Sequence, residues 1–194
     1  MTLIRVNPES VQRYGHEAQS IFDAMHGSLV GLVNEVVAVR YFGPNAVAFK
    51  SECGRLATEF ANRLHIDMAA MADAVRTSTS NIAAALGGAP VVIRLDPRSI
   101  VAPSPPVVDY VDVDTAALES LVPVVGDRFE SLRQGLADHL GRLQATDWEG
   151  NAKLMAIDAV SGFTASARST CDAADQSIVA YVRSQLQAVV AADR

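Results

Sequence analysis

The stretch Tyr41-Phe42-Gly43-Pro44-Asn45 separates two long segments in which apolar residues recur every three or four positions. The spacing runs through residues 11–39 before this stretch and through residues 49–86 after it. A three-four spacing is typical of an amphipathic helix, and the glycine and proline between the two segments indicate a turn. Two long helices joined by so short a turn run antiparallel. The sequence therefore predicts a helical hairpin over residues 1–88.

Residues typical of helix ends flank both segments. Asn7 can cap the first helix, Pro8 suits the first helical position, and Glu9 places an acid where the helix dipole favours it. Gly87 and Gly88 follow the second helix, in the position where glycine commonly ends one. The caps and the periodicity thus predict the same helix limits.

The first half of the chain recurs in the second half. Val113 lies 107 residues after Val6, and the same offset places Phe22 on Phe129 and Gly43 on Gly150 without a gap. A repeat of this length indicates two copies of one hairpin rather than a solenoid. We therefore expect a second hairpin over residues 114–194.

Residues 89–113 interrupt the helical pattern. They contain five prolines among short β-branched runs, namely Pro90, Pro97, Pro103, Pro105 and Pro106. Such a composition predicts an extended connector. The sequence leaves open whether it drapes over the helices or forms a short strand.

Each hairpin alone would expose a long apolar stripe to water. The other hairpin of the same chain covers that stripe most directly, so we expect an all-α, antiparallel four-helix bundle with pseudo-twofold symmetry. Pro123 falls inside the third predicted helix and should kink or interrupt it near Leu121.

Composition excludes several classes of protein. The 194 residues are 49% hydrophobic and 20% charged, which predicts a folded chain. The net charge of −6, with no basic run, argues against nucleic-acid binding. No run of 18 apolar residues is present, and the N-terminal stretch turns polar by Asn7. We therefore predict neither a membrane span nor a Sec signal peptide, so that export would need another route.

No catalytic motif is recognisable. The chain lacks a nucleophile elbow, a zinc-protease helix, a phosphate-binding loop and a Glu-x-x-His pair. We expect each histidine to stand alone on its helix, facing solvent or capped: His16, His26, His65 and His139. The sequence predicts a protein that is not an enzyme and needs no cofactor.

No metal-ligand spacing is present either. Cys53 and Cys171 lie far apart in helical segments, which favours buried thiols over a disulfide. Asp109, Asp112 and Asp114 lack the glycine and distal glutamate of a calcium loop, so a solvated, charged hinge is favoured over a calcium site.

The turn of the second hairpin contains Trp148-Glu149-Gly150, and Tyr41-Phe42-Gly43 stands in the equivalent place of the first. This arrangement resembles the WXG family of small type VII secretion substrates, in which two helical hairpins pair into a four-helix bundle. The resemblance covers nearly the whole chain as two fused hairpins, with Tyr41 replacing tryptophan in the first. The aromatic ring would cover the end of the hairpin core, and glycine would permit the backbone angle of a tight turn.

Members of that family, or their partners, often carry a Tyr-x-x-x-acid export signal after the second helix. The only match here is Tyr110 with Asp114, which makes these two residues a candidate secretion signal. Asp114 has an alternative role as the N-cap of the third helix.

The resemblance implies a non-enzymatic substrate, helper or binding partner of type VII secretion. It would leave the cell, or reach its surface, by a Sec-independent route and would bind a protein partner such as the secretion machinery. The alternative is a cytosolic helical adaptor that is not exported. Because the fused hairpins cover each other, we expect a monomer, with a homodimer as the alternative.

Overall fold

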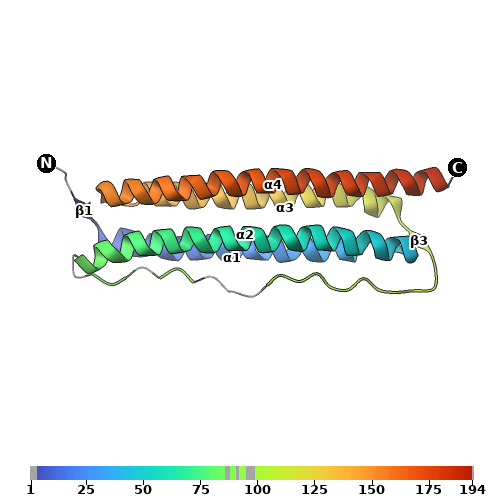
Figure 1. The fold of residues 1–194 in the computed structure, drawn as a ribbon, viewed down its shortest axis with the longest axis horizontal. Coiled ribbons are helices and arrows are strands. Elements are labelled where there is room, and N and C mark those ends of the chain that lie inside the picture. Colours follow the sequence, from blue (N-terminus) through green and yellow to red (C-terminus); the bar gives the residue numbers. More distant parts are fainter. Residues whose placement is uncertain (1–3, 86–87, 91, 95–98, 194) are drawn as a thin grey trace. The chain divides into compact units, whose positions relative to one another are not determined.

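The computed structural model of the chain describes residues 4–85, 88–90, 92–94 and 99–193, and within them it contains four α-helices (Figure 1). These are α1 (Pro8–Ala38), α2 (Pro44–Ala85), α3 (Thr115–Ala145) and α4 (Asn151–Ala192). The predicted all-α four-helix bundle of two hairpins is confirmed. Leu86 and Gly87, at the predicted end of the second helix, lie outside the described residues.

Four two-residue strands accompany the helices in the described part of the chain. They are β1 (Arg5–Val6), β2 (Tyr41–Phe42), β3 (Asp112–Val113) and β4 (Trp148–Glu149). Every bound of β1, α1, β2 and α2 recurs 107 residues later in β3, α3, β4 and α4. The second hairpin therefore repeats the first to the residue, at the offset that the sequence predicts.

Asparagine and aspartate caps explain where the first helix of each hairpin begins. The Asn7 side-chain Oδ1 accepts hydrogen bonds from the backbone N–H groups of Glu9 (3.1 Å) and Ser10 (3.3 Å) at the start of α1. The Asp114 Oδ1 accepts one from the N–H of Ala117 (3.1 Å) at the start of α3. Both predicted caps are confirmed, and each satisfies N–H groups that have no partner inside the helix.

The chain forms two compact units, and each unit takes segments from all four helices. Unit 1 comprises Met1–His26, Leu64–Arg98 and Arg133–Ser169, and unit 2 comprises Gly27–Arg63, Ser99–Leu132 and Thr170–Arg194. Every helix therefore contributes one part to unit 1 and the other part to unit 2.

Each unit has its own apolar core, built from the periodic residues. In unit 1, fully buried side chains come from all four helices, including Phe22, Leu64, Leu136 and Val160. Helix α3 approaches α1 closely at Gly135, where an added Cβ would lie 2.6 Å from the Met25 Cγ. Burying each large apolar side chain contributes about 1.5–3 kcal/mol.

The core of unit 2 is built in the same way. The Phe60 and Phe129 rings of α2 and α3 meet with centroids 4.9 Å apart, and the Phe49 and Tyr181 rings of α2 and α4 stack at 5.6 Å. Cys53 is fully buried in this core, Cys171 is equally buried, and neither forms a disulfide. The predicted buried thiols are confirmed.

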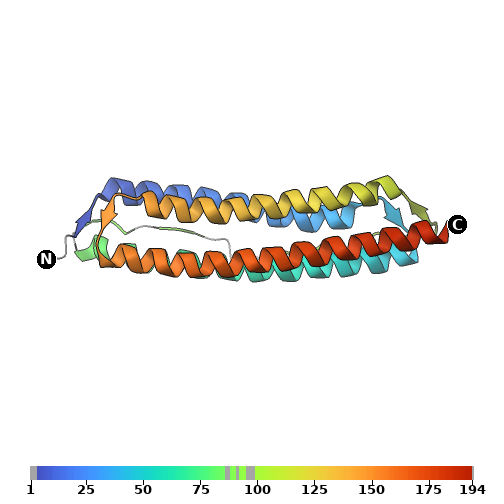
Figure 2. The same ribbon diagram turned by 90° about the horizontal axis from the view of Figure 1, so that it is seen from above.

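One strand pair lies in each unit and joins the two hairpins (Figure 2). In unit 1, β1 pairs antiparallel with β4, with Val6 opposite Trp148. In unit 2, β3 pairs antiparallel with β2, with Val113 opposite Tyr41. The segment that precedes the first helix of each hairpin thus pairs with the turn of the other hairpin. A two-residue strand has no periodicity, so the sequence pattern does not reveal it.

The connector packs against the first hairpin and ends in a strand, so both of the alternatives left open by the sequence occur. In unit 1 the Arg94 N–H donates to the Gln19 side chain of α1. In unit 2 the Asn62 side chain of α2 forms two hydrogen bonds with the backbone of Ile100, at 3.0 and 3.1 Å. Ile93 and Ile100 are buried, so apolar side chains anchor this segment as well.

Pro123 does not interrupt α3, contrary to the sequence-based expectation. The helix is continuous from Thr115 to Ala145, and Pro123 lies in its third turn with its side chain exposed. The helix is therefore not interrupted near Leu121, whereas the kink, the other outcome expected of Pro123, stays a prediction. The burial of Leu118, Leu121 and Val125 on the opposite face offsets the one backbone hydrogen bond that proline cannot donate.

Candidate functional site

The Trp148-Glu149-Gly150 turn lies in unit 1. The Trp148 side chain is 2% exposed, and its backbone N–H donates to the Thr146 carbonyl at 2.8 Å. Gly150 has a φ of +132°, which L side chains rarely adopt. Among the described residues, the indole Nε1 of Trp148 has no hydrogen-bond partner. The ring thus fills the core at this turn, and glycine allows the chain to enter α4.

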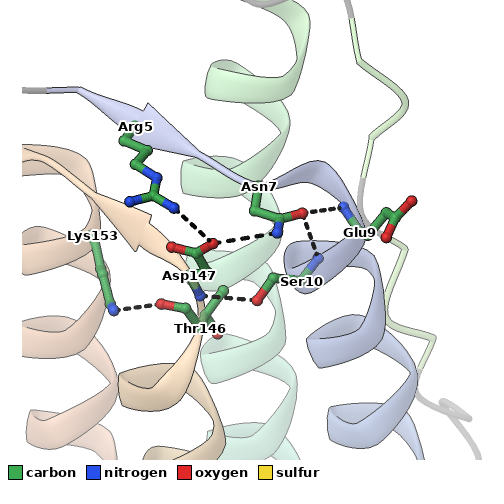
Figure 3. A network of polar contacts seen from close by, with 7 residues as sticks. All are labelled: Arg5, Asn7, Glu9, Ser10, Thr146, Asp147 and Lys153. Atoms are coloured by element: carbon green, nitrogen blue, oxygen red, sulfur yellow. Dashed lines mark hydrogen bonds and ion pairs between the residues drawn. The ribbon is translucent and has the colours of Figure 1, made fainter.

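A polar network holds this turn to the start of α1 (Figure 3). The Asp147 carboxylate lies 3.6 Å from the Arg5 guanidinium and accepts a hydrogen bond from the Asn7 amide at 3.3 Å. The Asp147 N–H donates to the Ser10 hydroxyl at 2.9 Å, and the Lys153 ammonium donates to the Thr146 carbonyl at 2.7 Å. Asn7 therefore both caps α1 and contacts the turn of the other hairpin.

The Tyr41-Phe42-Gly43 turn lies in unit 2 and follows the same plan. Tyr41 is 6% exposed, its ring centroid lies 5.7 Å from that of Phe49, and burial raises the pKa of its hydroxyl. Gly43 has a φ of +116°, and an added Cβ would lie 3.1 Å from the Val111 Cγ2. The equivalent turns of the two hairpins therefore use the same backbone geometry.

An ion pair also holds this second turn. The Arg40 guanidinium donates two hydrogen bonds to one Asp112 oxygen, at 3.0 and 3.1 Å. These hydrogen bonds and the negative charge of Asp112 raise the pKa of Arg40. The Asp114 N–H donates to the Arg40 carbonyl at 3.1 Å. Of the three acids expected to form a solvated hinge, Asp112 thus forms an ion pair and Asp114 caps a helix.

Lys50 is a buried cation that the sequence pattern does not reveal. It is 2% exposed, and its Nζ lies 4.7 Å from the centroid of the Phe42 ring. Burial lowers the pKa of Lys50. A cation over an aromatic face is attracted by the ring quadrupole, which helps to hold β2 against α2. The signal in the sequence is only that a lysine follows Phe49 on the apolar side of the helix.

Four of the six candidate residues lie together in unit 2. Tyr110 is 56% exposed, and the centroid of its ring lies 5.8 Å from that of Phe42. Phe42 is the middle residue of the turn that contains Tyr41 and Gly43. Asp114 is engaged as the cap of α3. Trp148 and Gly150 belong to unit 1. The candidate secretion signal is therefore adjacent to the tyrosine turn of its own unit.

His139 and Tyr14 form a buried polar pair in unit 1. The Tyr14 hydroxyl lies 2.8 Å from the His139 Nε2, and the two side chains are 2% and 0% exposed. Burial lowers the pKa of His139 to about 4 and raises that of Tyr14. His139 is therefore neutral at pH 7.

The expectation that each histidine stands alone and faces solvent or a cap is wrong for three of them. His139 lies in the core, where the centroid of its ring is 4.6 Å from the centroid of the Phe22 ring. His26 of α1 and His65 of α2 meet edge to face, with ring centroids 6.0 Å apart. The usable signal is that His139 occupies a position of the apolar stripe between Leu136 and Leu143.

In the part of the chain that the structure describes, no group of three or more His, Cys, Asp or Glu side chains is placed to hold a metal ion. The absence of a cofactor and of catalytic activity stays a prediction. Helix α1, which lies near the N-terminus, is long and apolar enough to cross a membrane by length and composition alone, a test that core helices and signal sequences also pass. Its residues Phe22, Leu29 and Val36 are fully buried within their units.

Two open grooves border the turns. A groove of about 580 Å³ in unit 1 is lined by Trp148, Lys153, Leu154 and Ile157, among others. A groove of about 780 Å³ in unit 2 borders Tyr41 and the end of α4. Comparisons of the chain with protein-family models, with curated proteins and with solved structures give no match.

Proposed function

We propose that this chain is a non-enzymatic helical binding protein, the single-chain equivalent of a paired WXG dimer, and that it acts as a substrate, helper or partner of type VII secretion. The observation that carries this proposal is the repeated hairpin with an aromatic-x-glycine turn in each copy. Both glycines have positive φ, and each turn pairs with the other hairpin. These features support the proposal, because the resemblance implies two helical hairpins that pair with each other.

An exposed apolar surface beside the tryptophan turn supports a role in protein binding. Leu154 and Met155 of α4 are each 65% exposed, and Leu154 lines the groove beside Trp148. Exposed methionine and leucine side chains are adaptable contact residues. The equivalent positions of the first hairpin hold the smaller Val47 and Ala48, so this surface belongs to the second hairpin.

Deletion of the secretion ATPase in the native cell tests the proposal. The extracellular level of the protein should fall to background, with a cytosolic marker showing that cells have not lysed. An unchanged extracellular level, together with no secretion component co-purifying with the protein, would overturn the assignment. A double variant, Leu154→Asp with Met155→Asp, should also lower export, and Ala48→Asp is the matched control because Ala48 is equivalent to Met155 and exposed.

One observation favours the alternative, a cytosolic adaptor that is not exported. The Asp114 carboxylate, the acid of the candidate signal, is already engaged with the start of α3. Asp114→Asn separates the two roles, since asparagine caps a helix as well as aspartate but carries no charge. If Tyr110 and Asp114 form an export signal, Asp114→Asn lowers export while the stability of the protein is unchanged. Export that is insensitive to both Asp114→Asn and Tyr110→Ala would remove these residues from the proposal.

A further inference from the structure

Residues 101–109 form an exposed, extended segment of unit 2 that belongs to neither a helix nor a strand (Figure 1). Its sequence is Val-Ala-Pro-Ser-Pro-Pro-Val-Val-Asp, and we call it the proline segment. The side chains of Val101 and Val107 are 75% and 83% exposed. Apolar side chains so exposed gain free energy when another apolar group covers them, which makes the proline segment a candidate contact surface.

The prolines favour the polyproline II conformation in this segment. Each proline fixes its own φ near about −65° and pushes the residue before it toward an extended conformation. The exposure follows the three-residue repeat of that helix, since Ala102, Pro105 and Val108 are half-buried and the other six residues are exposed. One edge of the segment therefore faces the first hairpin. Pro103 and Pro106, three residues apart, share an edge that faces outward.

Contacts on both sides of the prolines hold the proline segment in place. On one side Ala102 packs against α2 at Gly54, where an added Cβ would lie 3.1 Å from the Ala102 Cβ. On the other side the centroid of the Tyr110 ring lies 5.8 Å from the centroid of the Phe42 ring. A segment that is already held in one conformation loses less conformational entropy when it binds. The proline segment is therefore preorganised as a ligand.

The backbone of the proline segment is free to contact a partner. Among the described residues, none forms a hydrogen bond with residues 101–109, so their carbonyl oxygens can accept hydrogen bonds from another protein. The addition of this segment to a β-sheet is excluded, because its three prolines lack the N–H that a strand ladder needs. A second copy of the chain is also a poor partner. In the part of the chain that the structure describes, Tyr110 is the one well-exposed aromatic side chain.

We infer that the proline segment binds a groove lined by aromatic side chains on a partner protein. Such grooves recognise polyproline II segments with two prolines three residues apart, as Pro103 and Pro106 are. Val107 adds apolar contact beside them. Asp109 is exposed at the end of the segment, so a basic side chain next to the groove would complement its charge. This inference goes beyond the proposed function and does not depend on it, since an adaptor that stays in the cell would bind in the same way.

The test uses the full chain, immobilised as bait for an extract of the native cell. A synthetic peptide with the sequence of residues 101–109 should release the bound partner, whereas the same peptide with alanine at both outward prolines should not. The released protein is then purified, and its affinity for the full chain is measured by isothermal titration calorimetry. Replacement of the aromatic residues of its groove by alanine should weaken binding roughly tenfold or more.

Variants of this chain make the test specific. Pro103→Ala with Pro106→Ala removes the two outward rings and should weaken binding roughly tenfold or more. Pro105→Ala is the matched control, because Pro105 faces the hairpin, and it should change the affinity by less than about threefold. Leu154→Asp with Met155→Asp alters the exposed surface of unit 1 and should leave this binding unchanged. Because the prolines lie outside the helices, their variants should keep the helical circular dichroism of the original protein.

Three results would overturn the inference. They are the failure of the peptide to release any protein, a released protein that binds without aromatic residues, and binding that the double proline variant does not weaken. A sedimentation mass of two chains that the double proline variant returns to one would also overturn it, by assigning the segment to a second copy.

Discussion

The Arg5 guanidinium lies 3.6 Å from the Asp147 carboxylate in unit 1, and the equivalent positions in unit 2 hold an ion pair with its charges exchanged. There Asp112 stands in the place of Arg5, and Arg40 in the place of Asp147. Two first hairpins from different chains would set Arg5 against Arg40, and two second hairpins would set Asp112 against Asp147. The exchanged charges therefore favour the pairing of unlike hairpins. Because these pairs are exposed, water screens their charges and each adds little to the stability of the fold.

The buried Tyr14–His139 pair favours the same pairing more strongly. The repeat places Leu121 in the position of Tyr14 and Leu32 in the position of His139, and both leucines are buried. If like hairpins paired, Tyr14 would face Leu32 and its hydroxyl would lose its partner. A buried polar group without a partner costs about 1–3 kcal/mol. A single buried polar pair can thus select the partner and the register of helices.

The Arg5–Asp147 pair predicts a small, salt-sensitive coupling. Arg5→Asp places two acids side by side and should lower the free energy of unfolding by up to about 1 kcal/mol, whereas adding Asp147→Arg should recover most of it. Urea denaturation of the two single variants and the double variant measures the coupling. It should shrink in high salt, since salt screens exposed charges. A coupling of zero in low salt would show that this ion pair does not favour the pairing of unlike hairpins.

The Tyr14–His139 hydrogen bond predicts a larger coupling in the core. His139→Leu leaves the Tyr14 hydroxyl without a partner, and Tyr14→Phe leaves the His139 Nε2 without one, so each should cost about 1–3 kcal/mol. The double variant leaves neither group unpaired and should be less destabilised than the sum of the two. Denaturant midpoints of the four proteins give this comparison. Additive losses would contradict the role of the hydrogen bond.

His139 also predicts a pH dependence of stability. Its pKa falls from the ordinary 6.5 to about 4 in the folded protein, so the unfolded chain binds more protons between these values. Stability from this group is fully present above about pH 6.5 and is lost as the pH falls toward 4, by about 3 kcal/mol in all. His139→Gln should flatten the stability curve between pH 6.5 and 4 relative to the original protein. Parallel curves for the two proteins would refute this assignment.

The turn glycines predict a backbone penalty that helical glycines lack. Gly150→Ala forces a φ near +132° on a residue with a Cβ and should cost about 1–3 kcal/mol. Gly43→Ala should cost more, because its Cβ would also meet the Val111 side chain at 3.1 Å. Gly141→Ala is the control: Gly141 is exposed in α3 with open space around it, so alanine should stabilise by about 0.5–1 kcal/mol. Thermal unfolding distinguishes these outcomes, and equal effects at Gly150 and Gly141 would exclude strain at the turn.

The helices, their caps and the repeat could be predicted from the sequence, because each depends on residues only a few positions apart. The three-four spacing of residues 11–39 can be recognised without knowing which residues cover the apolar stripe. Asn7 and Asp114 bond to N–H groups two or three residues ahead. Pro123 is the exception, since its effect on α3 depends on how well the buried face holds the helix together.

The sequence by itself determined two tandem helical hairpins, because periodicity and capping act within a single helix. Only the tertiary structure decided that Tyr14 meets His139 across 125 positions and that two-residue strands join the hairpins. The physical reason is that such contacts depend on the three-dimensional packing of distant segments. The spacing of residues along one helix does not show which side chain of another helix contacts it.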